Sequence, residues 1–167
     1  LNERHYGALQ GETRGAMITR YGNAQVVQWR RAYDEVPPLL EDGDPRWAEQ
    51  LNRLKEVPFD RQPRAESLRQ AAERVAPSWH EAMVPALKAG GNLLVVAHTS
   101  ALRGLARVIE HLSDEQCEAF RIATAIPRLY VLGDDLRVQE KADLNEGLGS
   151  SLRYWGNRLK PRGLGWA

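Results

Sequence analysis

The sequence predicts an α/β domain, because a helical pattern, a buried strand and a second helical pattern follow one another along the chain. Apolar residues recur at spacings of three and four over residues 66–89, which indicates an amphipathic helix. Leu93–Ala97 is a continuous apolar run, typical of a strand buried on both faces of a parallel sheet. Helical spacing returns over Ser100–Leu112. Ligands of such sheets lie beyond the carboxyl ends of the strands, so the site is expected at residues 98–100.

The elements before this core are short. Residues 1–11 are expected to form a loop or the exit from a strand. A helix is predicted over Glu12–Tyr21, and Gly22 stops it. A second helical pattern runs over Asn23–Tyr33, and Pro37-Pro38 marks its latest end.

Residues 36–64 differ from the rest of the chain. They hold five prolines and the acidic stretch Glu-Asp-Gly-Asp at 41–44, which predicts a long irregular segment with a short helix around Trp47–Leu54. A loop of this length in a compact domain is usually functional or mobile. We interpret it as a cover over a site; a solvated insertion is the alternative.

The later elements follow from capping and turn signals. Pro77 and Pro85 predict a kink or break within the helix over 66–89. Ser-Asp-Glu-Gln from Ser113 is a capping box for a short helix. Two runs with strand character, separated by Gly-Asp-Asp, predict an antiparallel hairpin at the sheet edge, over residues 128–132 and 138–144. A last short helix is expected over 150–160.

Composition limits the classes of function. The 167 residues suit one domain with a sizeable core. The net charge is +1, with 23 basic and 22 acidic residues, so we expect neither a nucleic-acid partner nor an anionic membrane. A single cysteine, Cys117, excludes an internal disulfide framework and fits a reducing cytoplasm. No P-loop, dinucleotide glycine fingerprint, HExxH or GxSxG motif is present, and no metal-ligand spacing is recognisable.

His98 ends the apolar run and admits two interpretations. A histidine at the end of a strand is most often a partly buried residue bonded to the backbone. Thr99 and Ser100, however, come at the start of a helix, where free N–H groups and the helix dipole favour an anion. Arg103 lies one turn further into the same helix, and a solvated helix face is the alternative for it. The pattern therefore suits phosphate, carboxylate or an oxyanion.

A second cluster of candidate residues begins at the first residues of the chain. Glu3, Arg4, His5 and Tyr6 are followed by Arg14, Arg30 and Arg31. Arginine binds phosphate and carboxylate through two parallel hydrogen bonds, so converging arginines would hold a small, multiply charged anion. A glutamate beside them is a candidate general acid or base. The alternative is a set of solvated surface charges.

The sequence resembles the 2,3-bisphosphoglycerate-dependent phosphoglycerate mutases of the histidine phosphatase superfamily. The most specific stretch is Leu-Asn-Glu-Arg-His-Tyr-Gly-Ala-Leu-Gln-Gly at 1–11, and similarity continues through Arg31. It returns at Glu66-Ser67-Leu68, at Val95–His98 and at Thr124–Pro127. The resemblance covers most of the chain to about residue 140.

The resemblance implies a fold, a reaction and roles for single residues. The fold would be a flavodoxin-like three-layer sandwich, mostly parallel with an antiparallel edge, and residues 1–167 would be one domain. The reaction would interconvert 3-phosphoglycerate and 2-phosphoglycerate through a phosphohistidine, with 2,3-bisphosphoglycerate as primer and no metal. Glu3 would exchange the substrate proton, and His98 would stabilise the transferring group. The substrate-binding residues would be Arg4, His5, Tyr6, Arg14, Arg30, Arg31, Thr99 and Ser100.

The sequence departs from the family pattern at several points. Arg14 stands where lysine is usual, Thr99-Ser100 replaces Gly-Asn, and Ala125 replaces glycine. The family's nucleophilic histidine lies in an Arg-His-Gly motif on an N-terminal strand, and the 167 residues contain no such motif. Because the chain begins with Leu1, we expect it to represent the C-terminal two thirds of such a domain, without the N-terminal strands and inactive alone.

Three functions therefore stay open. The resemblance favours a cytoplasmic mutase of glycolysis and gluconeogenesis that acts on small phosphorylated three-carbon acids, as a homodimer or homotetramer. Thr99-Ser100 leaves room for a phosphatase of the same superfamily. The missing nucleophile leaves room for a non-catalytic module that binds phosphorylated metabolites.

Overall fold

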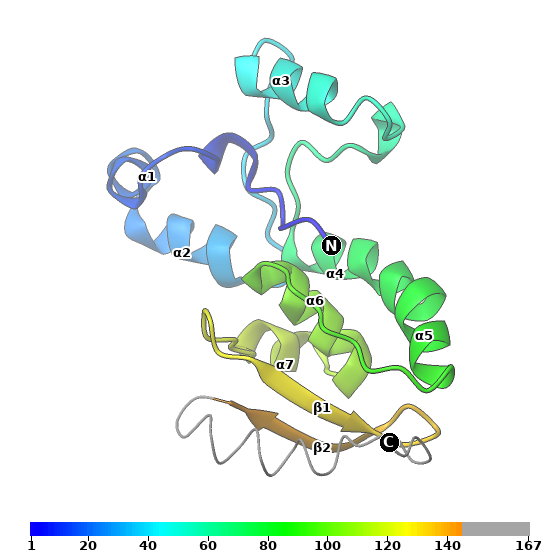
Figure 1. Cartoon of the computed structure of the whole chain (residues 1–167). Helices are drawn as coiled ribbons and strands as arrows, with labels where there is room; N and C mark the ends of the chain where they lie inside the picture. Colours follow the sequence, from blue (N-terminus) through cyan, green and yellow to red (C-terminus); the bar gives the residue numbers. More distant parts are fainter. Residues whose placement is uncertain (145–167) are drawn as a thin grey trace.

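The computed structural model describes residues 1–144, in which short helices joined by irregular segments accompany the packed helix pair α4 and α6 (Figure 1). The α-helices in this range are α1 (Arg14–Tyr21), α2 (Asn23–Arg31), α3 (Pro45–Arg53), α4 (Leu68–Pro77), α5 (Val84–Lys88), α6 (Thr99–Glu110) and α7 (Asp114–Ala119). Short 3₁₀ turns, η1 and η2, cover Gly7–Leu9 and Phe59–Arg61. The helix expected over 150–160 lies outside the described residues.

Side-chain caps begin several helices where the sequence predicts them. Thr13 accepts a hydrogen bond from Ala16 N at the start of α1. Ser67 and Ser113 form complete capping boxes at α4 and α7, with Gln70 and Gln116 respectively. Each cap satisfies N–H groups that a helix start leaves unpaired. One boundary was wrong: α2 ends at Arg31, before Tyr33, because the backbone becomes extended at Ala32.

The long helix over 66–89 is interrupted as its prolines predict. α4 ends at Pro77, and a π-helical segment, η3 (Ser78–Met83), follows before α5. A proline lacks the N–H that the helical ladder needs, so the hydrogen-bond pattern shifts beside Pro77 and restarts at Pro85. The apolar stripe nevertheless continues through the interruption, because Val75 and Trp79 both belong to the main core.

Helices α4 and α6 pack against each other and form this core. Val75 and Trp79 meet Ala101, Leu105 and Ile109 in one buried cluster. The helices approach closely at Gly104, where an added Cβ would lie 2.7 Å from the Cα of Ala72. Glycine is therefore required at this position by packing.

The strand predicted at Leu93–Ala97 does not form in the structure. This segment is irregular, with Leu94 89% and Val96 84% exposed, whereas Val95 and Ala97 pack on the α4–α6 core. Within residues 1–144, no other segment forms a backbone hydrogen bond with it. Its side chains thus alternate as in a strand, but only one face is covered, because none of the described segments supplies a neighbouring strand.

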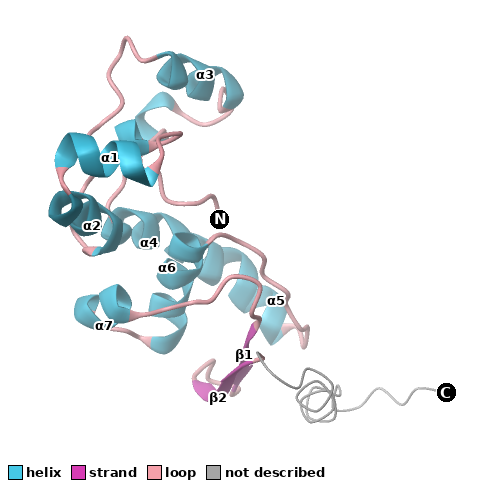
Figure 2. Ribbon diagram, turned by 90° about the vertical axis from the view of Figure 1, so that its left-hand side faces the viewer, coloured by secondary structure: helices cyan, strands magenta, loops and turns pink. Residues whose placement is uncertain are grey.

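The described sheet is a two-stranded antiparallel hairpin of β1 (Arg128–Leu132) and β2 (Val138–Asp143), as predicted. It lies at the lower end of the molecule in both views (Figure 2). Tyr130 donates a hydrogen bond of 2.6 Å to Glu110 at the end of α6, and Lys141 pairs with the same carboxylate. The described residues therefore combine many helices with a small antiparallel sheet, and no parallel sheet forms among them.

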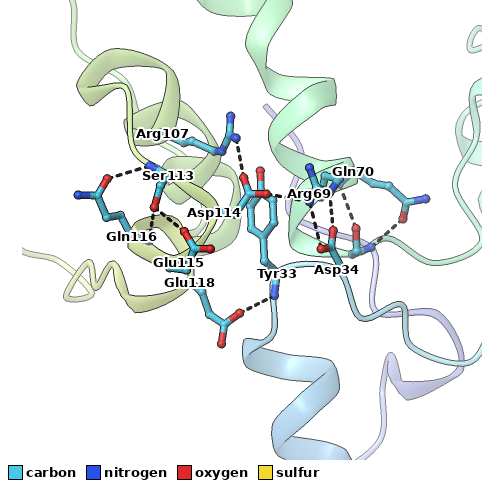
Figure 3. A network of polar contacts seen from close by, with 11 residues as sticks. Tyr33, Asp34, Arg69, Gln70, Arg107, Ser113, Asp114, Glu115, Gln116 and Glu118 are labelled. Atoms are coloured by element: carbon cyan, nitrogen blue, oxygen red, sulfur yellow. Dashed lines mark hydrogen bonds and ion pairs between the residues drawn. The ribbon is translucent and has the colours of Figure 1, made fainter.

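A polar network joins the exit of α2 to α4, α6 and α7 (Figure 3). Asp114 accepts hydrogen bonds from Arg69 at 2.8 Å and from Arg107 at 2.7 Å. Both guanidinium groups lie against the Tyr33 ring, 4.8 and 5.4 Å from its centroid. Glu118 accepts a hydrogen bond of 3.0 Å from the Tyr33 amide. The network fixes where α2 ends relative to the start of α7.

Candidate active site

A cavity of about 550 Å³ opens between the first residues of the chain, α1, α2 and the start of α6. Its size lies within the usual range of small-molecule sites. Eight of the ten predicted site residues line it: Glu3, Tyr6, Arg14, Arg30, Arg31, His98, Thr99 and Ser100. A second cavity, of about 390 Å³, lies between the end of α6 and β2, and none of the predicted site residues lines that one.

Glu3 lies at the N-terminus of α6. Its Oε2 accepts a hydrogen bond of 3.1 Å from the backbone N–H of Ser100, so a carboxylate occupies the anion-favouring helix start. Its Oε1 is buried and has no hydrogen-bond partner within residues 1–144. The Tyr6 hydroxyl and the Ser100 hydroxyl are 3.1 Å apart. One glutamate oxygen is thus anchored, and the other has no hydrogen-bond partner among the described residues.

Arg4 holds the scaffold behind the cavity. Its side chain is 2% exposed, Nε donates to the carbonyl of Glu66 at 2.7 Å, and Nη2 donates to the carbonyls of Trp29 and Glu35. Burial lowers the pKa of this guanidinium. Nη1 is buried and has no partner among the described residues. Arg4 does not line the cavity, and its predicted contact with substrate stays a prediction.

His5 also points into the scaffold. Its Nδ1 accepts a hydrogen bond of 2.9 Å from the Gly7 N–H, so the ring proton lies on Nε2, which donates to Gln50 Oε1 at 2.6 Å. Burial lowers the pKa of His5 and favours this neutral form. Gly7 has φ +58°, and a Cβ there would lie 2.1 Å from the carbonyl oxygen of Pro38. His5 and Gly7 therefore attach the 36–64 segment to the first residues.

The 36–64 segment does not line the cavity. It places α3 at the top of Figure 1, where Gln50 and Arg46 bind the first residues of the chain on the side away from the cavity lining. Its predicted role as a cover gains no support from this arrangement.

Glu66 supports the backbone of the first residues from a buried position. Its side chain is 5% exposed, Oε2 accepts a hydrogen bond of 2.8 Å from the His5 N–H, and Arg74 donates to both of its oxygens. A buried carboxylate with these partners stabilises the backbone from which Glu3 and Tyr6 project. The sequence signal for it was only the position of Glu66 within the resemblance.

Three exposed arginines supply positive charge at the cavity. Arg14 comes from α1, whereas Arg30 and Arg31 end α2. None of the three forms an ion pair with a described carboxylate. The Arg30 guanidinium lies 5.7 Å from the centroid of the Tyr6 ring. Unpaired arginines around one cavity suit an anionic ligand.

Two further arginines, which are not among the ten predicted site residues, line the cavity: Arg103 of α6 and Arg121 just after α7. The alternative of a solvated Arg103 is wrong, since its side chain is 7% exposed. The spacing of three from Ser100 places Arg103 on the same helix face, and this signal could have identified it. For Arg121 the sequence offered no such signal, because its position depends on how α7 packs.

The described residues can therefore bind an anion and exchange a proton. Five arginines and a single carboxylate line the cavity, and His98 lies among them. Within residues 1–144, no group of three histidine, cysteine or acidic side chains is placed to hold a metal ion. In the same range, no helix has the length and apolar character needed to span a bilayer.

Comparisons with known proteins identify the family of the chain. The model of the histidine phosphatase superfamily (branch 1) matches residues 39–143. Proteins named 2,3-bisphosphoglycerate-dependent phosphoglycerate mutase are similar as well. One from Pasteurella multocida is 47% identical over 141 residues, 84% of this chain and 62% of its own length. One from Bacteroides fragilis is 41% identical over 140 residues, 84% of this chain and 56% of its own length.

The chain thus spans about three fifths of the length of these relatives. The family model covers well over half of the chain, including the start of α6 and the hairpin that packs on it. By this match the chain belongs to the histidine phosphatase superfamily, branch 1.

Proposed function

We propose that the cavity binds small phosphorylated three-carbon acids, and that the chain serves a 2,3-bisphosphoglycerate-dependent phosphoglycerate mutase. The observation that carries this proposal is the convergence of eight predicted residues, from positions 3 to 100, on one arginine-rich cavity. The names of the similar proteins support it. Phosphoryl transfer needs positioning and positive charge around the moving oxygens, and this cavity supplies both.

Each residue has a defined part in this proposal. Arg14, Arg30 and Arg31 hold an anionic group of the substrate, phosphate or carboxylate, helped by the hydroxyls of Tyr6, Thr99 and Ser100. Glu3 exchanges the proton of the substrate hydroxyl through the oxygen that Ser100 leaves free. His98 stabilises charge on the transferring group.

The remaining parts of the proposal rest on the resemblance. A phosphohistidine would form on the histidine of an Arg-His-Gly motif, which these residues do not contain. The complete domain would be a flavodoxin-like sandwich, in which Leu93–Ala97 is a parallel strand. We further propose glycolysis and gluconeogenesis as the pathway, the cytoplasm as the location, and a homodimer or homotetramer as the assembly.

Ligand binding tests the cavity directly. We expect 3-phosphoglycerate to bind the 167-residue chain in a calorimetric titration, and Arg30→Gln to weaken binding about tenfold, because a charge-assisted contact is lost. Arg53→Gln is the matched control, since this exposed arginine ends α3, outside the cavity. Equal affinities of all three proteins, or no binding, would contradict the proposal.

Activity separates the mutase from its alternatives. With an Arg-His-Gly segment supplied before Leu1 and the bisphosphate as primer, we expect 3-phosphoglycerate to isomerise and Glu3→Gln to abolish isomerisation. Release of inorganic phosphate that outruns isomerisation would identify the phosphatase, for which Thr99-Ser100 is the specific observation. Binding without either reaction would leave the non-catalytic module.

A further inference from the structure

Two cavity-lining arginines have no part in the function proposed above. Arg103 projects from the first turns of α6, and Arg121 follows the end of α7. They come from a different part of the molecule than Arg14, Arg30 and Arg31. Helix α2 lies above α7 in both views of the molecule, so the cavity is bounded by cations from two sides of the chain (Figures 1 and 2).

Arg103 is buried and only partly satisfied. Its Nη2 donates to the carbonyls of Cys117 at 2.9 Å and Glu118 at 2.8 Å. Its Nε is buried and has no hydrogen-bond partner among the described residues. Burial lowers the pKa of this guanidinium, and the nearby charge of Arg121 lowers it further. A buried cation with an unused donor is costly unless an anion completes its surroundings.

Arg121 is exposed but held in place. Its Nη1 donates to the carbonyls of Glu118 at 2.6 Å and Phe120 at 3.0 Å. The same Glu118 carbonyl therefore accepts from both arginines and keeps two like charges near each other. The end of α7 leaves free carbonyls that can fix them, at its negative pole.

Glu118 also fixes this side of the cavity relative to α2. Its carboxylate accepts the Tyr33 amide, two residues after Arg31, and Figure 3 shows this contact beside the Asp114 network. The backbone two residues after Arg31 is thus bonded to the same residue, Glu118, whose carbonyl binds Arg103 and Arg121. Because both sets of arginines are held in place, the protein loses less conformational freedom when a ligand contacts both of them.

We propose that Arg103 and Arg121 form a second anion-binding subsite, which receives the second anionic group of a ligand that carries two. Arg14, Arg30 and Arg31 hold the first group. This inference rests on the proposed function and deepens it, because it makes the cavity selective for small molecules with two phosphate or carboxylate groups over those with one. An anion at the second subsite offsets the repulsion between the two arginines.

Paired titrations of the 167-residue chain test the subsite. The probes are 2,3-bisphosphoglycerate, with separated anionic groups, and inorganic phosphate, with one. We expect Arg121→Gln to weaken bisphosphate binding about fivefold at low salt and to change phosphate binding less than twofold, since the contact lies at an exposed rim. Arg121 is exposed, so the variant should keep the wild-type melting temperature. Arg53→Gln, which removes one charge outside the cavity, should change neither affinity.

The outcomes separate this inference from the proposed function. If wild-type chain binds neither probe, both fail. If it binds the bisphosphate and Arg121→Gln behaves like Arg53→Gln, only the second subsite is overturned. If Arg121→Gln weakens both probes equally, the cavity has a single anion subsite and the inference is wrong. Arg121→Lys should recover part of the bisphosphate affinity, which a loss caused by altered packing would not.

Discussion

Helix α6 and the segment just before it, Leu93–Ala97, are both apolar and adjacent in sequence, yet only α6 forms a regular element. α6 forms as expected and buries Ala101, Leu105 and Ile109 in the main core. Leu93–Ala97 covers that core with one face and exposes Leu94 and Val96 on the other. The difference lies in where the hydrogen-bond partners are. A helix satisfies its own backbone, whereas a strand depends on another segment.

The largest expected effect tests the buried side of this comparison. Leu105→Ala should lower the free energy of unfolding by about 3 kcal/mol, because the leucine is 5% exposed and its loss leaves a cavity between α4 and α6. Urea denaturation followed by circular dichroism measures the change. A loss below about 1 kcal/mol would show that the α4–α6 core is not the centre of stability.

The next effect concerns the close approach of the same helices. Gly104→Ala should destabilise the protein by about 2 kcal/mol, because its Cβ would collide with the backbone of Ala72. The cost of this collision exceeds the gain in helix propensity from alanine. Gly15→Ala in α1 is the matched control. Nothing lies within 4 Å of its added Cβ, so that change should be neutral or stabilising. If both variants changed the free energy of unfolding in the same direction, α4 and α6 would lie further apart than the structure shows.

The sequence could predict elements that carry their own local signals. Ser113 predicted a helix start through its capping box, and Pro77 predicted the interruption after α4. The strand at Leu93–Ala97 could not be decided locally, because its pattern is the same with or without neighbours. For the site, eight of the ten residues that the resemblance named line one cavity, whereas the place of Arg121 depends on how α7 packs against α6, which no local pattern encodes.

A local cap should matter less than the shared core. Ser67→Ala should lower the free energy of unfolding by about 1 kcal/mol, because the N–H of Gln70 loses its acceptor. The same denaturation experiment measures it, and Ser67→Thr or Ser67→Asp should restore most of the loss. If neither restores it, the serine matters for packing and not for capping.

The buried His5, which contacts Gln50, should make the stability of the protein depend on pH. Burial lowers the pKa of His5, so the unfolded chain binds the proton more readily than the native chain. Stability from this group is present above the unfolded value of about 6.5 and declines as pH falls below it, by at most about 1.4 kcal/mol per pH unit. Melting temperatures of wild type and His5→Gln, measured between pH 8 and pH 5, isolate this contribution. An equal decline in both proteins would contradict the assignment.

The smallest effect is expected on the exposed face of Leu93–Ala97. Leu94→Ala should change the free energy of unfolding by less than about 0.5 kcal/mol, because the side chain is 89% exposed and has almost no contacts to lose. Leu105→Ala, eleven positions later in the chain, makes the same chemical change in a buried environment. A Leu94→Ala loss close to that of Leu105→Ala would mean that another strand or another copy of the chain covers the outer face of Leu93–Ala97 in solution. Dilution separates those two cases, since only cover by a second copy weakens as the protein concentration falls.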